Sequence, residues 1–440
     1  MGTTFRGSHH TPAPSPALRR LRVALTVFFA VDGFLFAGWV VRIPAIKAQV
    51  GASAGQLGLA LLGVSAGAIA TMMITGRLCR RLGSERVTVL TGILLALSIA
   101  LPPRTHSALA LGLVLLLFGI AYGGLNVAMN SVAVDLIAAL RRPVMSGFHA
   151  AYSLGGLLGA GLGGLLAPHL SPRTHLLLLT PIGLVAVVLA GRVLLAHPLR
   201  GPGSGTPGAP AADAPEDVRP AAGTGPASTA DAESGPDAAP AGRPAPAGLL
   251  VALVGMIAGC SAYGEGALAE WGPLHIQQDL HGGPGIAAAG YAAVACAMML
   301  GRLSGTALIE RLGQTRALVL GGLTASAGML LGALAPSIPL VVAGFALTGL
   351  GLANLFPTAI ARAGELTGPG GVAAASTVGY GGMLLGPPSI GFLTDALGLP
   401  TALTTVSVLA AVAAAIAYVL RNGAPGGSRQ VRRSAAPARK

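Results

Sequence analysis

Long apolar stretches recur along the whole chain and restrict its possible folds more than any other feature. Roughly twenty apolar residues in helical form cross the hydrocarbon core of a bilayer, where backbone groups must find their hydrogen-bond partners inside the segment. The sequence predicts twelve such segments, six on each side of a long polar gap. They span residues 21–44, 54–76, 86–103, 107–136, 145–168, 174–197, 247–275, 285–308, 316–335, 338–361, 371–394 and 400–420.

The composition agrees with lipid as the surrounding solvent. Of the 440 residues, 53% are hydrophobic and only 10% are charged, and the mean hydropathy is +0.72. A water-soluble chain typically carries about 25% charged residues. Glycine is abundant, with 66 residues, and small residues let helices pack closely in lipid. We therefore predict an all-α membrane protein and not a soluble enzyme.

The polar gap at 198–246 divides the chain into two halves. It is rich in Pro, Gly, Ala and Ser, and it holds six of the fifteen acidic residues. Such a segment cannot bury a core, so we predict a disordered linker. The predicted domains are a disordered N-terminus at 1–20, six-helix bundles at 21–197 and 247–420, and a basic tail at 421–440.

The basic residues predict the orientation. With the N-terminus in the cytoplasm, all but four of the 28 lysines and arginines fall on the inner side, the exceptions being Arg42, Lys47, Arg104 and Arg173. This is the positive-inside pattern. It predicts a multi-pass protein of the cell membrane with both termini cytoplasmic, and it accounts for the net charge of +13 without nucleic-acid binding.

The two halves also share local sequence. Residues 76–83 follow the second predicted helix and residues 310–313 follow the eighth, and both segments end in Arg-Leu-Gly. Residues 118–126 have a counterpart in 348–354. Parallel six-helix repeats joined by a long loop are the organisation of one large transporter class.

At these residues the chain resembles the major facilitator superfamily. The superfamily signature after the second helix is Gly, three residues, Asp-Arg, one residue, Gly and two basic residues. Gly76, Arg81 and Gly83 match it, while Arg80 stands at the acidic position. The second copy keeps Glu310, Arg311 and Gly313. The resemblance implies two pseudo-symmetric bundles around one solute pathway.

Residues 32–46, 148–156 and 265–271 are similar to the YbjJ-type branch of that superfamily, which is distantly related to fucose permeases. Fucose permeases resemble this chain in having an aspartate in helix 1. The resemblance implies secondary transport of a small solute by alternating access.

Three titratable residues are candidates for proton coupling. Asp32 lies about eleven residues into the first helix, near mid-bilayer at about 1.5 Å per residue. A charge there is costly, so its presence predicts a function; the alternative is a structural hydrogen bond to a neighbouring helix. Glu265 is the deeper of two acids in the seventh helix. His149 can titrate near neutral pH, as a proton relay or as an interfacial histidine.

Other polar residues are candidates for solute contact. Asn126 and Asn130 share one helix face, and Asn354 lies in the matching helix of the second half; the alternative role of these amides is bonding between helices. Tyr152 lies three residues after His149. These four side chains are predicted to contact the solute.

Two residues near the outer end of the seventh helix have alternative roles. Glu270 is predicted to contact the solute or to pair with Arg42 at the outer rim. Trp271 is predicted to anchor the helix at the membrane interface or to stack on a sugar ring.

A gate is predicted on the inner side. We expect Asp135, at the inner end of the fourth helix, to form a salt-bridge cluster with Arg80 and Arg81. Helix-breaking Pro357 and the pair Pro387-Pro388 are expected to bend their helices.

Several functions are excluded by missing motifs. The sequence has no Gly-x-x-x-x-Gly-Lys-Ser/Thr, no His-Glu-x-x-His and no Gly-x-Ser-x-Gly with plausible partners. The three cysteines have no metal-site spacing. We therefore predict no enzyme, cofactor or metal. Protons are the predicted energy source, because Asp32, Glu265 and His149 can titrate and no ATP-binding motif is present. The protein is predicted to be a monomer. Sugar-like solute uptake is preferred; the alternatives are metabolite or drug efflux and a non-transporting sensor or scaffold.

The predicted orientation is testable by cysteine labelling. Single cysteines placed in 198–246 should react with a membrane-impermeant maleimide only after the inner side of the membrane is made accessible. Labelling of intact cells from outside would contradict the predicted topology.

Overall fold

The computed structural model describes residues 15–140, 144–199, 247–367 and 369–422, and these residues are helical almost throughout. The helices of the N-terminal half are α1 (Pro16–Val40), α2 (Ile43–Val50), α3 (Ala54–Leu82), α4 (Ser84–Ser98), α5 (Ala108–Leu140), α6 (Met145–Leu166) and α7 (Pro172–Ala196). Those of the C-terminal half are α8 (Ala247–Gln278), α9 (Pro284–Leu312), α10 (Gln314–Leu334), α11 (Ile338–Leu352), α12 (Leu355–Thr367), α13 (Pro369–Leu397) and α14 (Leu399–Val419).

The helices are long and apolar enough for a membrane. By length and hydropathy, ten spans within the described residues could cross a bilayer, α11 and α12 counting as one. The helices α6 and α13, of 22 and 29 residues, run beside these ten spans and bring the number of long helical segments among the described residues to twelve. The predicted all-α membrane fold of two six-helix bundles is confirmed. The predicted linker and tail lie outside the described residues except for 198–199 and 421–422, and so do residues 1–14 of the predicted disordered N-terminus, whereas Pro16 onward is helical.

Helix ends follow local sequence signals. The Ser15 hydroxyl accepts from the Leu18 N–H and Pro16 occupies the first turn, so α1 begins five residues before its predicted start. Glycines with positive φ end the corresponding helices α3 and α9, with φ of 90° at Gly83 and 79° at Gly313. The repeated glycine therefore makes the same turn in both halves.

The helices that were expected to bend at Pro357 and at Pro387 differ in their response to proline. A proline removes an N–H and leaves the carbonyl four residues earlier without its helical partner. Ahead of Pro357 the helix breaks at Ala353 and Asn354, separating α11 from α12. Pro387 lies inside the continuous helix α13, where the freed Met383 carbonyl accepts a hydrogen bond from the Ser65 hydroxyl of α3, at 3.2 Å.

Small residues let helices approach to backbone contact within each half. A Cβ on Gly33 of α1 would overlap the Tyr152 carbonyl oxygen of α6, and a Cβ on Gly155 of α6 would overlap the Ala30 carbonyl oxygen of α1. The glycine-rich run of α6 is therefore a helix surface and not a loop.

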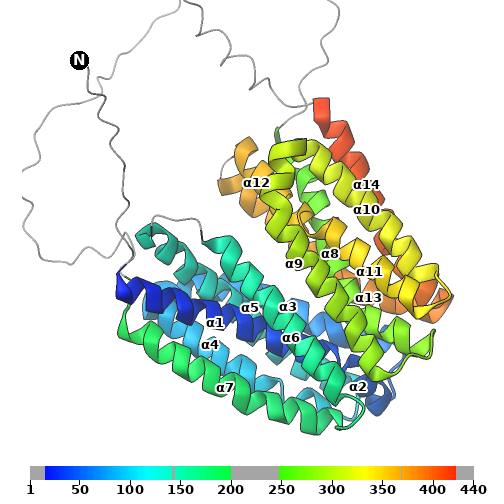
Figure 1. Ribbon diagram of the computed structural model, residues 1–440, viewed down its shortest axis with the longest axis horizontal. Coiled ribbons are helices and arrows are strands. Elements are labelled where there is room, and N and C mark those ends of the chain that lie inside the picture. The colour runs from blue at the N-terminus through cyan, green and yellow to red at the C-terminus, as the bar shows by residue number, and fades with distance from the viewer. Residues whose placement is uncertain (1–14, 141–143, 200–246, 368, 423–440) are drawn as a thin grey trace, which may run out of the picture.

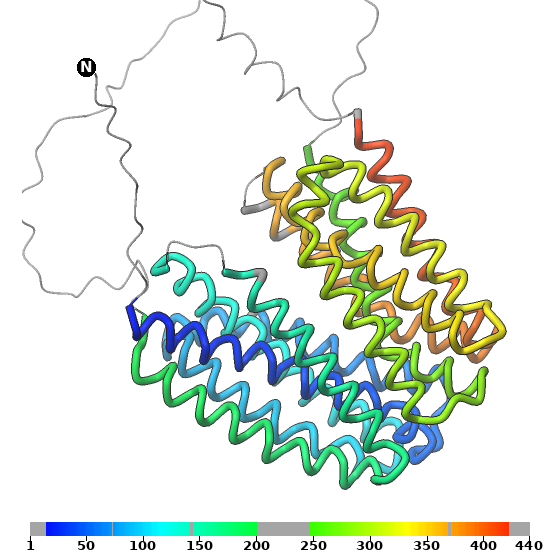
Figure 2. Tube along the Cα trace, in the orientation of Figure 1, coloured from blue at the N-terminus to red at the C-terminus, as the bar shows by residue number. Residues whose placement is uncertain are grey.

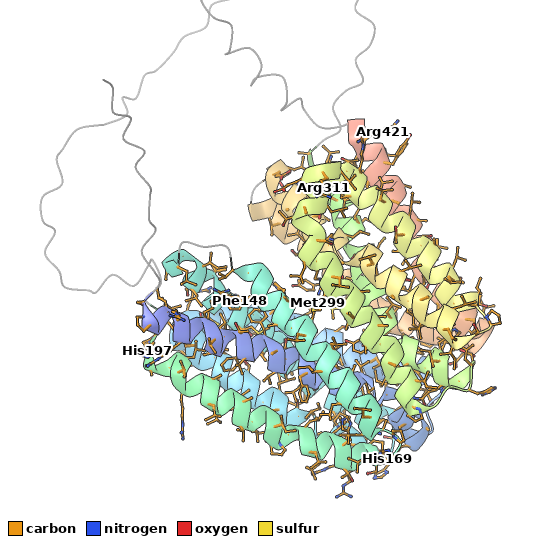
Figure 3. All side chains as sticks on the ribbon, viewed as in Figure 1. Phe148, His169, His197, Met299, Arg311 and Arg421 are labelled. Carbon is orange, nitrogen blue, oxygen red and sulfur yellow. The ribbon has the colours of Figure 1, made fainter. Side chains whose placement is uncertain are left out.

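The two bundles meet at one end and diverge at the other. Figure 2 shows the divergence at the end where the described termini lie, which we call the terminal end. At the opposite end, the far end, α3 packs on α13 and α6 packs on α9. Figure 3 shows His197, Arg311 and Arg421 at the terminal end and His169 at the far end.

Each seam at the far end joins the second long helix of one half to the fifth of the other. In the α6–α9 seam, the Cβ position of Gly285 lies 3.1 Å from the Gly164 carbonyl oxygen. In the α3–α13 seam, that of Gly58 lies 2.5 Å from the Pro387 carbonyl oxygen. The seams are related by the pseudo-symmetry of the two halves.

The α1–α6 contact predicts opposite effects for two alanine substitutions on α6. Gly155→Ala should destabilise the protein by about 1–3 kcal/mol because the helices must separate. Gly161→Ala is the control, since its Cβ would meet nothing within 4 Å and alanine favours a helix by about 0.5–1 kcal/mol. Thermal unfolding of the purified protein in detergent should show a lower melting temperature only for Gly155→Ala. Equal melting temperatures would contradict the contact.

Candidate functional site

Polar side chains of the N-terminal half gather on α1, α5 and α6, where this half faces the other. The Tyr122 hydroxyl of α5 lies 3.0 Å from the Tyr152 hydroxyl of α6. Asp32 of α1 lies within electrostatic range of both tyrosines and is fully buried. Neither of its carboxyl oxygens has a hydrogen-bond partner among the described residues. An intramembrane carboxyl of this kind is a functional candidate.

The C-terminal half contributes an ion pair at the same level. Arg302 of α9 donates from Nη2 to Oε2 of Glu265 on α8, at 3.1 Å. Both side chains are about 30% exposed, so the pair is only partly enclosed by protein. The Ser261 hydroxyl lies 3.4 Å from Oε1 of Glu265. The carboxylate is therefore held from two sides.

Electrostatic interactions connect the polar groups of α1, α5 and α6 with the ion pair of α8 and α9 across the interface between the halves. Tyr122 lies within electrostatic range of Glu265 and Tyr291, and His149 within that of Arg302. His149 is exposed and meets the Phe29 ring edge-on, with ring centroids 5.5 Å apart. We call these seven residues the central cluster: Asp32, Tyr122, His149, Tyr152, Glu265, Tyr291 and Arg302. Four of them were singled out from the sequence, whereas Tyr122, Tyr291 and Arg302 were missed. From the sequence, Arg302 was counted only among the basic residues of the inner side.

The predicted pairing of Glu270 with Arg42 is wrong. Arg42 donates from Nε to Nδ1 of His175 at 2.9 Å, and from Nη1 to the Ala167 carbonyl at 3.4 Å, both within its own half. Glu270 is 6% exposed, and its Oε2 has no partner among the described residues. The arginine takes partners from α6 and α7 because their ends lie beside it.

Trp271 is not an interface anchor. Its side chain is 1% exposed, so protein encloses it, and its Nε1 has no partner among the described residues. An anchoring tryptophan needs its polar edge at the membrane surface. Together with Glu270, it places unpartnered polar atoms inside α8 on the far-end side of the central cluster.

The three asparagines all have protein partners. Asn130 donates to the Asn126 carbonyl at 2.8 Å within α5. Asn354 donates to the Gly301 carbonyl of α9 at 2.8 Å, across the break between α11 and α12. The alternative role of bonding between helices therefore describes Asn354 in this conformation.

The expected inner salt-bridge cluster is absent among the described residues. Asp135 is half-buried on α5 and forms no ion pair with any residue that the structure describes, while Arg80 and Arg81 are exposed. Glu310 and Arg311 are likewise exposed at the end of α9. Asp135, Arg80 and Arg81 belong to the same half, and both arginine side chains are exposed at the end of α3, where they do not reach the carboxylate.

A polar link at the far end was missed by sequence reasoning. Asp395 of α13 accepts from the Ala54 N–H at 3.0 Å, the Gly55 N–H at 2.8 Å and the Ser53 hydroxyl at 2.9 Å. These groups form the N-terminus of α3, where unpaired N–H groups and the helix dipole favour an anion. One carboxylate of the C-terminal half thus accepts three hydrogen bonds from the N-terminal half.

Comparisons with known proteins agree with this architecture. The sequence model of the Major Facilitator Superfamily matches residues 23–307 and 251–440. An uncharacterized MFS-type transporter of Yersinia pestis is 31% identical over 412 residues, which cover 93% of this chain and 97% of that protein. The membrane protein MosC of Rhizobium meliloti is 28% identical over 425 residues, covering 95% of each chain.

Solved structures share the fold. A bacterial homologue of the human lysosomal transporter Spinster, in an inward-facing and unoccupied conformation, superposes with a TM-score of 0.68 at 14% identity and covers 92% of this chain and 97% of its own. A mutant of the nucleoside transporter NupG gives a TM-score of 0.66 at 12% identity, covering 91% and 98%.

The Asp395 link predicts a conformational effect. Asp395→Ala should release the N-terminus of α3, and loss of such a cap weakens an interaction by about 1 kcal/mol. In a background without native cysteines, a Ser65→Cys probe in the α3–α13 seam should then react about fivefold faster with a maleimide applied from the far side. Asp279→Ala is the control because this carboxylate pairs with His275 of its own half, at 2.8 Å. Unchanged reactivity in Asp395→Ala would show that the link does not hold the seam.

Proposed function

The chain belongs to the Major Facilitator Superfamily and is a secondary transporter, and we propose that it couples solute movement to protons through Asp32. The supporting observation is the isolation of this carboxyl. It is fully buried in α1 and has no hydrogen-bond partner among the described residues. A structural carboxyl would be held by neighbouring donors. A carboxyl that binds and releases a proton needs access to water in one conformation and enclosure in the other.

The ion pair of Glu265 and Arg302 supplies the second half of the proposed coupling. It lies on the opposite bundle and is partly exposed. A proton on Glu265, or a solute that binds Arg302, would compete with the pair. Because Asp32 and Glu265 belong to different bundles, rocking of the halves changes the surroundings of both carboxyls together. His149, which lies within electrostatic range of Arg302, completes the proposed proton path.

The proposed solute is small and polar, and sugar-like uptake fits best. The central cluster offers the hydroxyls of Tyr122, Tyr152 and Tyr291, which suit hydroxylated solutes, and their rings give apolar faces. The helix 1 aspartate and the YbjJ-type stretches resemble the distantly related fucose permeases. Asn126 and Asn130, on the same helix as Tyr122, remain candidate contacts for the solute in another conformation.

Efflux of a metabolite or drug is the second candidate. One observation favours it: Asn130 and Asn354 donate their amides to protein carbonyls, which leaves fewer polar groups for a strongly polar cargo. Counterflow in vesicles reconstituted with the protein, run with a sugar panel and a hydrophobic-amine panel, separates the two. A sensor would bind a solute without moving it.

The Asp32 proposal is tested by Asp32→Asn. The amide cannot carry the proton, so accumulation driven by a pH gradient should be lost while solute exchange without a gradient persists. Both are measured as uptake of labelled solute into vesicles. Asp279→Asn serves as the matched control, since it removes a far-end carboxylate outside the central cluster. Accumulation by Asp32→Asn at the rate of the unaltered protein would remove Asp32 from the mechanism.

A further inference from the structure

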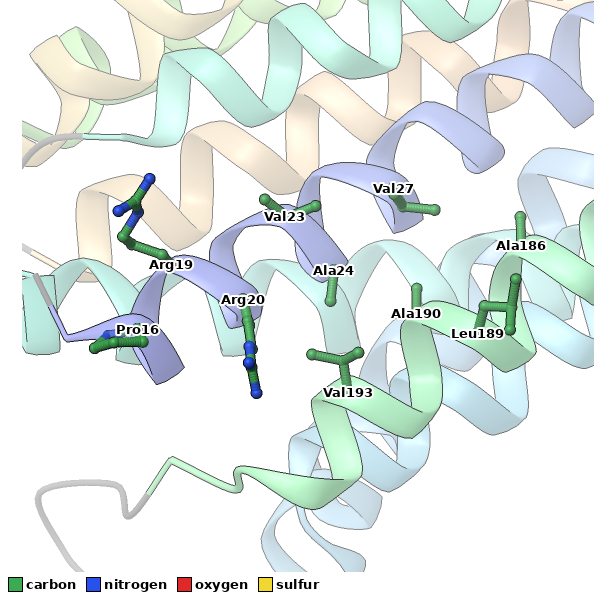
Figure 4. Close-up of a pocket in the computed structure, with 10 residues that line it drawn as sticks. All are labelled: Pro16, Arg19, Arg20, Val23, Ala24, Val27, Ala186, Leu189, Ala190 and Val193. Atoms are coloured by element: carbon green, nitrogen blue, oxygen red, sulfur yellow. The ribbon is translucent and has the colours of Figure 1, made fainter.

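We infer that the groove between α1 and α7 at the terminal end binds an anionic phospholipid. This groove has a volume of about 600 Å³ and lies on the outside of the N-terminal bundle, away from the central cluster. Figure 4 shows its walls, formed by one face of α1 and one face of α7. The residues that line them include Arg19, Arg20, Val23, Ala24, Leu189 and Ala190.

The groove exists because two antiparallel helices separate along their length. Near the far end they are in close contact, where Leu179 lies over Gly38 and Leu35 lies against Gly183. Toward the terminal end the facing side chains include small ones, such as Ala24 and Ala190. Between residues 186 and 193 the gap runs about 10 Å along α7, from 1.5 Å per residue. This is the shape of a site for an extended chain.

The walls of the groove are apolar and open to the membrane. Val23 is 64% exposed and Leu189 is 58% exposed. In a transporter of this family these faces meet hydrocarbon, so an acyl chain lies between them without loss of polar contacts. The groove alone would accept any lipid.

The arginines select the headgroup. Arg19 and Arg20 lie at the terminal end of the groove, and Figure 4 shows the Arg20 side chain directed into the space between α1 and α7. Neither side chain forms an ion pair or hydrogen bond with any residue that the structure describes. Guanidinium groups bind phosphate oxygens by paired hydrogen bonds, and basic residues near a bilayer attract anionic lipid.

Photolabelling of the full chain tests this assignment. The protein is reconstituted in phosphatidylcholine vesicles that contain a trace of phosphatidylglycerol with a diazirine on its acyl chain, and labelled peptides are mapped by mass spectrometry. We expect labels on residues 16–27 and 186–193. Arg20→Gln should reduce this labelling about fivefold, which corresponds to about 1 kcal/mol for one arginine. Arg77→Gln, which removes another exposed arginine of the terminal end, should leave it unchanged.

Three further measurements distinguish binding of an anionic lipid in the groove from contact with bulk lipid. Phosphatidylcholine with the same diazirine chain should label the groove at least fivefold less, because it lacks net negative charge. Inorganic phosphate in excess should not compete, because the chain contributes to binding. Ala186→Leu, which fills the groove while keeping both arginines, should also reduce labelling. Equal labelling by the two lipids, or no effect of Arg20→Gln in a protein with unaltered thermal unfolding, would show bulk-lipid contact only and overturn the assignment.

Discussion

Direct contact between helix backbones is the interaction on which this structure depends. Lipid does not drive helices together, so close packing and polar contacts must do so. At Gly33 and Gly155 a single methyl group would separate α1 from α6. The same kind of contact joins the two halves, at Gly58 against Pro387 and at Gly164 against Gly285. Contacts of this kind need few side-chain changes to slide or open, which suits bundles that must move against each other.

The few polar groups inside this apolar framework fall into two kinds. Some complete the fold, as when the Met383 carbonyl, released by a proline, accepts from Ser65 of the other half. Others, including Asp32, lack partners among the described residues in this conformation. An unpartnered polar group inside a membrane protein is costly. A change of conformation or a bound solute that supplies partners to groups of the second kind would therefore lower the free energy most.

The sequence predicted what depends on periodicity and charge placement, and failed where distance in space decides. Segment length and hydropathy were enough for twelve helices, and the turn glycines Gly83 and Gly313 were found by their repeat. The helix containing Arg302 was predicted, but its contact with Glu265 depends on the packing of α8 against α9. Asp395 was missed because it lies 341 residues from the Ala54 N–H that it accepts from. No local pattern marks such a contact.

The two seams at the far end are equivalent by symmetry but not by chemistry. Asp395 supplies a carboxylate to the N-terminus of α3, whereas the N-terminus of α9 follows Gly283 and has no side-chain cap. A duplicated protein with two identical seams would have no intrinsic order of opening. Here one junction contains a carboxylate that accepts hydrogen bonds from the start of α3, and the other lacks a side-chain cap at the start of α9 among the described residues. The two halves should therefore begin to separate at the far end between α6 and α9, and the contact between α3 and α13 should open last.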